Sequence, residues 1–185
     1  MTNATAIAAW ALALETRSCC SDLASGWVGP PLIHSRQGFS ANDPTFHYIN
    51  THLESFDANI RELQGGELRA GPANTPLPLI IAMDSNAQAF PLPQDPTYTD
   101  FVSAGYNDVW SEIFSKRAGL TCCQAESDNN PVSQLYQRID LVLTHGKVTP
   151  WGTELIGTNP ASRLPDGFWP SDHAAVVAGV LVGSE

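Results

Sequence analysis

Four short polar motifs contain the side chains of this sequence that could do chemistry. They are residues 50–54 (NTHLE), 83–86 (MDSN), 138–140 (RID) and 171–173 (SDH), each inside an apolar stretch or at its end. Carboxylate and amide oxygens bind hard cations, and a histidine held by a carboxylate can move protons. The motifs therefore point to hydrolysis that uses a metal ion together with an acid–base group.

Asp84 follows the apolar run 79–83, where an unpaired buried carboxylate would be costly. Asn86, two residues later, presents an amide on the same side. One interpretation is an aspartate that caps a turn. The other is an Asp–Asn pair that holds a metal ion or a phosphate oxygen.

Asp140 lies within an apolar stretch and shares a strand face with Arg138, because side chains alternate along a strand. The two could form a structural ion pair. Alternatively, Asp140 orients His173, which follows Asp172 directly before another apolar run, and His173 acts as a base. His52 is either a histidine satisfied within the core or a second histidine of the site.

A sheet must position these motifs. Aromatic and β-branched residues, and continuous apolar runs, predict strands. We expect strands over 46–53, 77–83, 138–144 and 174–182, helices over 57–70 and 98–104, and an irregular stretch over 117–136. Strands that alternate with helices and loops indicate an α/β (or α+β) protein with a buried sheet.

The helix over 57–70 has a capping residue, Ser55 or Asp57, and apolar residues at helical spacing. The apolar positions are Phe56, Ile60 and Leu63. Two glycines in the middle, 65 and 66, each weaken the helix by roughly 1 kcal/mol.

The composition suits one globular domain: 185 residues, 43% hydrophobic, with a net charge of −10 from 19 acidic and 9 basic residues. This acidity argues against broad neutralisation of nucleic-acid phosphates. It does not exclude nucleic acid as a substrate, because a metal ion can lie between protein carboxylates and a phosphate.

No apolar run approaches the ~20 residues that span a bilayer. Residues 6–14 resemble a short signal-peptide core, but no Lys or Arg precedes them and no small-x-small cleavage site follows. We therefore favour a surface helix, or a chain that begins partway through a larger gene, over secretion.

The four cysteines form two adjacent pairs, Cys19–Cys20 and Cys122–Cys123, without the ligand spacing of a zinc site. Neighbouring residues on a strand point to opposite faces, so one sulfur of each pair is expected to point inward as a small hydrophobe. A disulfide between one member of each pair is an alternative.

The order of the four motifs resembles that of the endonuclease/exonuclease/phosphatase superfamily, which includes deoxyribonuclease I. The resemblance covers residues 36–185 and leaves 1–35 as an unassigned N-terminal segment. It implies a four-layer α/β sandwich with two packed sheets, and hydrolysis of phosphoesters assisted by Mg²⁺, with Mn²⁺ as an alternative ion.

The resemblance also implies roles for individual residues. His173 would be the catalytic histidine, Asp140 its orienting carboxylate, and His52 a second histidine that stabilises phosphate or assists the leaving group. Asp84 and Asn86 would contact the metal ion and the phosphate, Asp172 would be a metal ligand, and Asn50 and Arg138 would support these groups.

Two features depart from the family pattern. The usual Gly-Asp-Phe-Asn is Met83-Asp84-Ser85-Asn86, and the family's Asn and metal-binding Glu before the first motif have no convincing counterpart. Glu15 stands too close to His52 for the intervening family segments to fit. The sequence is therefore interpreted as the C-terminal part of the domain, incomplete at its N-terminal side.

The leading hypothesis is a Mg²⁺-dependent phosphoesterase acting on nucleic acid, a phospholipid or a small phosphate ester. The alternative is a catalytically inactive fragment that serves as an interaction module. An incomplete domain would leave an apolar sheet face uncovered, so we also expect self-association and weak metal binding.

Overall fold

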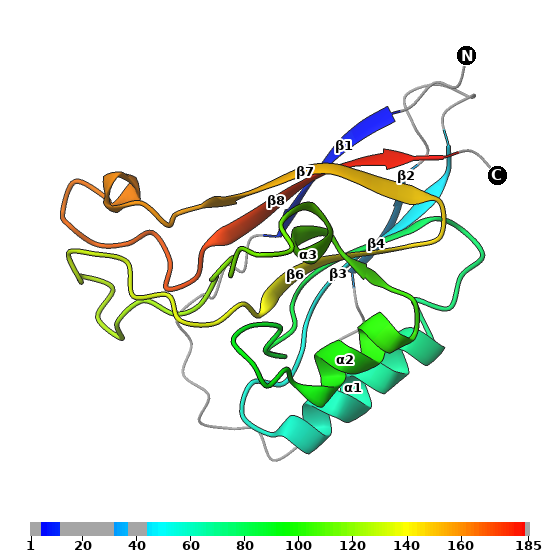
Figure 1. Cartoon of the computed structure of the whole chain (residues 1–185), viewed down its shortest axis with the longest axis horizontal. Coiled ribbons are helices and arrows are strands. Elements are labelled where there is room, and N and C mark those ends of the chain that lie inside the picture. Colours follow the sequence, from blue (N-terminus) through cyan, green and yellow to red (C-terminus); the bar gives the residue numbers. More distant parts are fainter. Residues whose placement is uncertain (1–4, 12–31, 37–43, 184–185) are drawn as a thin grey trace.

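The structure, a computed structural model, describes residues 5–11, 32–36 and 44–183, and only the backbone of the first two segments. Two sheets pack face to face, and two helices cover the far face of the larger sheet (Figure 1). The mixed α/β architecture expected from the sequence is confirmed.

The larger sheet has the strand order β2-β3-β4-β6-β5. Its strands are β2 (Leu32–Arg36), β3 (Phe46–His52), β4 (Leu79–Asp84), β6 (Asp140–His145) and β5 (Asn107–Asp108). β3 and β4 are parallel and the other pairs are antiparallel. The strands expected over 46–53, 77–83 and 138–144 are thus confirmed, and they are neighbours in one sheet.

The smaller sheet is antiparallel and has the order β1-β8-β7, formed by β1 (Thr5–Ala11), β8 (Ala175–Val182) and β7 (Val148–Ile156). β8 confirms the strand expected over 174–182. The surface helix expected over 6–14 is wrong for residues 6–11, which belong to strand β1 because their backbone pairs with residues 176–181 of β8.

The helices α1 (Ala58–Ala70) and α2 (Pro96–Ser103) confirm the two expected helices, and a short α3 (Val109–Ile113) was not anticipated. Asp57 caps α1 by accepting the backbone N–H groups of Asn59 and Ile60. Asp95 caps α2 in the same way.

The apolar spacing on α1 does not mark its buried face. Phe56 is 86% exposed and Leu63 69%, whereas Gly65 and Leu68 are buried. A Cβ atom on Gly65 would lie 2.7 Å from Thr97 Cγ2 of α2. The glycine is inside because α2 approaches α1 too closely for a larger side chain.

Two apolar cores lie on opposite faces of the larger sheet. Ile81 and Leu141 belong to the core under the helices, and Ala82 and Val142 belong to the core between the sheets. Because neighbouring residues of one strand contribute to different cores, both faces of β4 and β6 are covered, as their continuous apolar runs predict.

β7 was missed in the sequence because it contains Pro150 and Gly152, which weaken strand patterns. The strand accommodates them because it lies at the sheet edge and its register shifts between these two residues. Trp151 lies on this edge strand and is 61% exposed.

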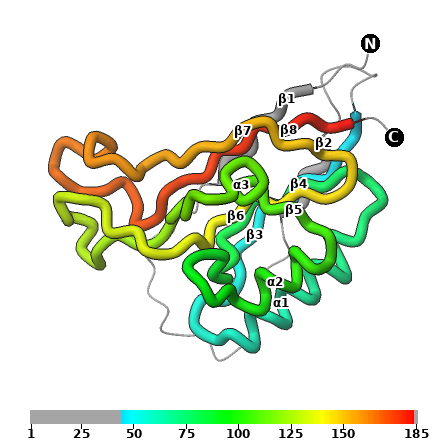
Figure 2. Tube along the Cα trace, in the orientation of Figure 1, coloured from blue at the N-terminus to red at the C-terminus, as the bar shows by residue number. Residues whose placement is uncertain are grey.

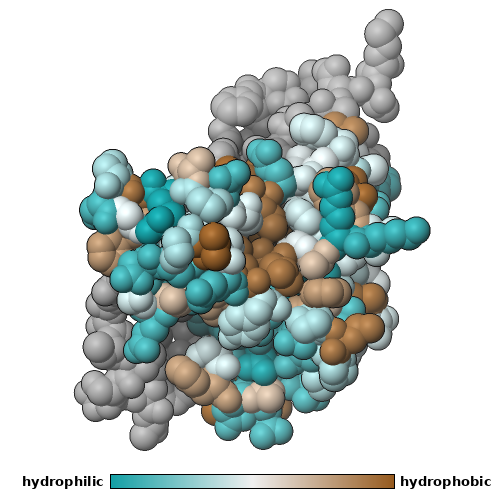
Figure 3. All heavy atoms as spheres, turned by 60° about the vertical axis from the view of Figure 1, so that its left-hand side comes forward, coloured by the Kyte–Doolittle hydropathy of each residue, from teal (hydrophilic) through white to brown (hydrophobic). Residues whose placement is uncertain are grey.

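The irregular stretch over 117–136 is confirmed, and it meets the segment before β8 at one end of the molecule (Figure 2). Trp169 is buried there, and its indole N–H donates to Asn130 O at 2.9 Å. Hydrophobic side chains gather in the middle of this end of the molecule, with hydrophilic ones around them (Figure 3). No helix in the described part of the chain is long and apolar enough to cross a membrane.

Candidate active site

The register of the larger sheet places three of the expected site residues in one row. His52 is paired with Asp84 across β3 and β4, and Asp84 with Asp140 across β4 and β6. Ala82 and Val142, two residues along from the aspartates, belong to the core between the sheets. By the two-residue period, the carboxylates therefore face the smaller sheet.

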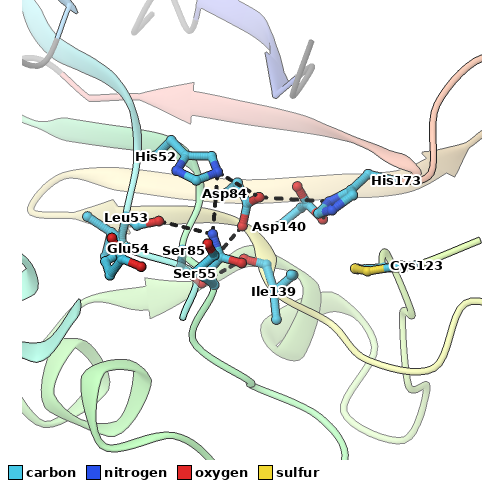
Figure 4. Close-up of polar contacts among 12 residues, drawn as sticks. His52, Leu53, Glu54, Ser55, Asp84, Ser85, Cys123, Ile139, Asp140 and His173 are labelled. Atoms are coloured by element: carbon cyan, nitrogen blue, oxygen red, sulfur yellow. Dashed lines mark hydrogen bonds and ion pairs between the residues drawn. A yellow bond between two sulfur atoms is a disulfide. The ribbon is translucent and has the colours of Figure 1, made fainter. Parts of the chain in front are cut away.

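His173 completes the group from the other sheet, because it lies just before β8. Its Nδ1 is 2.8 Å from Asp140 Oδ2 and 3.9 Å from Asp84 Oδ2, and its side chain is only 8% exposed. Figure 4 shows His52, Asp84, Asp140 and His173 in this arrangement. The structure thus brings together residues that lie up to 121 positions apart in the chain.

Asp84 is buried, and its two carboxylate oxygens have different surroundings. Its Oδ1 accepts the backbone N–H of Asn86 at 2.9 Å. Its Oδ2 is buried and accepts no hydrogen bond from the described residues. Burial, and secondarily the charge of Asp140, raise the pKa of Asp84 to about 6, although His173 and His52 oppose this shift.

The pKa of His173 is raised as well. Burial lowers this pKa, but the hydrogen bond to Asp140 and the negative charges of Asp140, Asp84 and Asp172 outweigh it and raise the value to about 9. Burial is thus the main cause of the Asp84 shift, whereas the neighbouring carboxylates cause the His173 shift against the effect of burial.

A hard divalent cation fits this arrangement. One ligand atom each of Asp84, Asp140 and His173 lies within 4.8 Å of the others. The buried Oδ2 of Asp84 accepts no hydrogen bond from the described residues, although two imidazole nitrogens lie 3.4 and 3.9 Å away, and a cation would satisfy it. Asp172 is not part of this group, although its charge acts on His173.

Asn86 and His52 form the more open side of the site. The Asn86 amide donates to Leu53 O at 3.0 Å and lies 3.4 Å from His52 Nε2. His52 Nε2 is also 3.4 Å from Asp84 Oδ2, and the His52 side chain is 48% exposed. This exposure argues against a histidine satisfied within the core. Asn86 has a φ of 47°, which asparagine tolerates better than most residues.

Ser85 stands where the family pattern has phenylalanine, and it is fully buried. Its hydroxyl donates to Ile139 O at 2.6 Å, and its backbone N–H donates to the same oxygen at 2.9 Å. The substitution thus ties the segment after β4 to the residue before Asp140.

Two residues expected to support the site point elsewhere. Arg138 forms a buried ion pair with Asp108 and donates to Ser111 Oγ at 3.0 Å, so the alternative of an Arg138–Asp140 pair is wrong. The long side chain of Arg138 reaches Asp108, which lies on the neighbouring strand β5. Asn50 donates to Ala82 O at 3.1 Å within the sheet. Glu15 lies outside the described residues.

Sequence reasoning missed Thr121, which is fully buried. Its hydroxyl accepts the backbone N–H groups of Ile139 and Asp140, each at 3.1 Å. Its carbonyl accepts the N–H of Ala174 at 2.7 Å. Thr121 therefore links the start of β6 to the segment that carries His173. A lone threonine in an irregular stretch offers no signal by which to find it.

The cysteine expectations are partly wrong. Cys122 is buried, as expected, but it is joined to Cys123 by a disulfide, so the two sulfurs do not point to opposite faces. The alternative, a disulfide between one member of each pair, is therefore wrong for Cys122 and Cys123, which are bonded to each other. Cys19 and Cys20 lie outside the described residues.

No protein-family model matches the sequence, and no curated protein matches it. Solved structures do match. D. rerio TDP2 complexed with a single-strand DNA product is 21% identical, with a TM-score of 0.58 over 75% of this chain and 57% of that one. A Bacteroides thetaiotaomicron endonuclease/exonuclease/phosphatase family protein is 18% identical, with a TM-score of 0.52 over 77% and 50%.

The human Nocturnin catalytic domain with bound sulfate anion is 21% identical, with a TM-score of 0.51 over 75% of this chain and 47% of that one. The chain thus spans about half the length of the structures it resembles. At these identities the similarity shows the fold, and it confirms the fold that the order of the four motifs predicts.

Proposed function

We propose that this chain, whose fold is that of the deoxyribonuclease I-like superfamily, hydrolyses phosphate esters with the help of a divalent cation. The observation that carries the proposal is the Asp140–His173 pair, 2.8 Å long, beside the buried and unsatisfied Oδ2 of Asp84. A proton-transfer pair next to an unsatisfied hard-ligand oxygen is what metal-assisted hydrolysis requires.

Asp140 and His173 would activate the attacking water. Asp140 holds Nδ1 of the imidazole, which leaves the other ring nitrogen to accept a proton. With a pKa of about 9, His173 is protonated at neutral pH in the metal-free protein. Bound Mg²⁺ or Mn²⁺ would supply positive charge that stabilises the phosphate in the transition state and lowers the pKa of neighbouring groups. His173 could then act as a base at neutral pH.

His52 and Asn86 would contact the substrate. Both come from segments that end at the same edge of the sheet, and His52 is half exposed beside the buried carboxylates. An imidazole in that position can donate to a phosphate oxygen or protonate the leaving group. Asp84 would hold the cation, because its buried Oδ2 accepts no hydrogen bond from the described residues.

The substrate class is nucleic acid, a phospholipid or a small phosphate ester. The D. rerio TDP2 structure holds a single-strand DNA product, and the Nocturnin structure holds a sulfate anion. The net charge of −10 opposes tight binding of a polyanion without a cation between the two. We therefore expect any binding of nucleic acid to depend on the metal ion.

Hydrolysis of bis-p-nitrophenyl phosphate and of p-nitrophenyl phosphate, with Mg²⁺, Mn²⁺ or EDTA, tests the proposal. Activity should need the metal, and His173→Gln should lower kcat roughly 10²–10⁴-fold, the usual contribution of acid–base catalysis. Asp84→Asn should also raise the metal concentration needed for half-maximal rate.

Two controls match these variants. His145→Gln changes a histidine that packs on Tyr106 at the other end of β6, and Asp100→Asn changes a partly exposed aspartate paired with Arg69. Both should retain activity. If the folded wild-type chain hydrolyses neither ester with either metal, the inactive-fragment alternative is favoured and the proposal is wrong.

A further inference from the structure

The disulfide lies against the segment that carries His173. Cys122 forms isolated β-bridges with both Gln137 and His173. Two residues further along, the Gln124 N–H donates to Asp172 O at 2.8 Å. These backbone contacts fix the two cysteines beside the catalytic pair without help from the disulfide itself.

The sulfur atoms and a ring nitrogen of His173 form a second cluster of ligands. One ligand atom each of Cys122, Cys123 and His173 lies within 4.8 Å of the others. Cys122 is 1% exposed, and the Gln137 side-chain amide donates to its sulfur at 3.7 Å. Figure 4 places Cys123 on the side of His173 away from Asp84. His173 is the one residue that this cluster shares with the carboxylate cluster.

We propose that reduction of the Cys122–Cys123 disulfide opens a site for a thiophilic divalent cation of the Zn²⁺ class, with His173 as its third ligand. A dithiol reductant supplies two electrons and two protons. The bond between the cysteine sulfurs breaks, each sulfur gains a hydrogen atom, and the reductant becomes a disulfide. On metal binding the two thiols and the protonated His173 ring release three protons to solvent, and both thiolates and a ring nitrogen bind the ion.

The donor set selects the ion. Thiolates and imidazole bind Zn²⁺ tetrahedrally, at ~2.3 Å and ~2.0–2.1 Å, whereas Mg²⁺ takes oxygen ligands. Adjacent cysteines lack the spacing of a zinc finger, but here the third ligand comes from residue 173, brought next to them by the β-bridge. Water would occupy the fourth position.

The site would act as a switch on the proposed function. A soft cation bound to His173 would compete with the Asp140–His173 hydrogen bond and with the oxygen-ligand site. The inhibitory part of the inference thus rests on the proposed phosphoesterase activity. Metal capture itself does not, and it can be measured without a substrate.

Cobalt, a spectroscopic substitute for zinc, tests the site. Cys19→Ser and Cys20→Ser are present in every protein tested, so that sulfur absorption reports this cluster alone. The protein is reduced with dithiothreitol, freed of the reductant without oxygen, and titrated with Co²⁺. We expect a thiolate-to-cobalt charge-transfer band that saturates at one equivalent, release of three protons per ion in unbuffered solution near neutral pH, and loss of the band when Zn²⁺ is added.

The variants identify the ligands. Cys122→Ser/Cys123→Ser should abolish the band, and the disulfide form of the parent should lack it. His173→Gln should weaken Co²⁺ binding by about tenfold or more. Loss of a partner of a metal ligand already costs about 10–100-fold, and here a ligand itself is lost. His145→Gln should change nothing. Circular dichroism checks each fold, and Cys123→Ser alone, at the more exposed cysteine, is used if the double variant does not fold.

Two results would overturn the inference. One is a reduced, folded parent protein that shows no thiolate-to-cobalt band. The other is an affinity for Co²⁺ that His173→Gln leaves unchanged, which would remove the link to the catalytic pair. Absence of phosphoesterase activity would leave both measurements intact, so the two proposals fail separately.

Discussion

His173 belongs to two clusters of opposite chemical character. On one side its Nδ1 is held by Asp140 and lies near Asp84, and on the other a ring nitrogen lies beside two sulfurs. Its protonation and its availability to substrate therefore depend on which partner is charged or bound. Two measurements on single residues test the pKa of His173 and the hydrogen bonds of Thr121.

The first concerns the proton on His173. In the metal-free protein, NMR titration should give this histidine a pKa of about 9. Asp140→Asn should lower the pKa by more than one unit, because the hydrogen bond to a charged partner is lost while burial, which lowers the pKa, remains. Asp100→Asn should leave it unchanged. A wild-type value below 7 would contradict the geometry of the pair.

The second concerns Thr121, whose hydroxyl accepts two backbone N–H groups at the start of β6. Thr121→Val keeps the shape but leaves both donors unsatisfied, so we expect a loss of about 1–3 kcal/mol in unfolding free energy. Thr144→Val is the matched control, because the buried Thr144 hydroxyl has no hydrogen-bond partner among the described residues. Equal effects of the two changes in urea denaturation would exclude the anchoring role.

At the scale of elements, the parallel pair β3 and β4 and the antiparallel strand β6 create the site. Parallel strands end at the same sheet edge, and an antiparallel neighbour begins there. His52, Asp84 and Asp140 thus form a row at one edge. The helices pack on the opposite face of this sheet, where Gly65 of α1 lies close to Thr97 of α2.

Two neighbouring glycines of α1 test that contact. A Cβ atom on Gly65 would lie 2.7 Å from Thr97 Cγ2, whereas one on Gly66 would have nothing within 4 Å. Gly65→Ala should therefore destabilise the protein by about 1–2 kcal/mol through overpacking. Gly66→Ala should stabilise it by about 0.5–1 kcal/mol through helix propensity. Thermal and urea unfolding measure both, and effects of the same sign would contradict the packing described here.

At the scale of the whole molecule, the raised pKa values predict how stability depends on pH. A raised folded-state pKa stabilises the protein below the unfolded value, and this stabilisation is lost as the pH rises through the folded value. For Asp84 this loss falls between pH 3.8 and about 6, and for His173 between 6.5 and about 9. The metal-free protein should therefore lose stability, on the order of a few kcal/mol, as the pH rises across these windows.

Urea unfolding in EDTA at several pH values, in wild type and variants, checks this. Asp84→Asn should flatten the dependence in the lower window, and His173→Gln should flatten it in the upper window. Titrating groups remote from the site contribute equally to wild type and variant and cancel in the comparison, whereas Asp84 and His173 shift each other's pKa, so each variant also displaces the remaining window. Parallel curves for wild type and both variants would show that these two groups do not carry the linkage.

Four strands, β3, β4, β6 and β8, and the candidate site residues were selected from the amino-acid sequence alone. Continuous apolar runs define buried strands, and a polar residue at the end of such a run must lie at a sheet edge. The two-residue period then assigns Asp84 and Asp140 to definite faces. These are local properties of the chain, and so His52, Asp84, Asp140 and His173 can be selected from their sequence context.

Which distant groups meet depends instead on the tertiary structure. Strand register placed His52, Asp84 and Asp140 in one row, and the packing of the two sheets brought His173 to Asp140. Arg138 turned to Asp108 rather than to Asp140, and α1 buried Gly65 and left Leu63 exposed. Thr121 and the Cys122–Cys123 pair acquired their partners through bridges to residues 137–140 and 173–174. Such contacts depend on the relative placement of elements, which local sequence patterns do not encode.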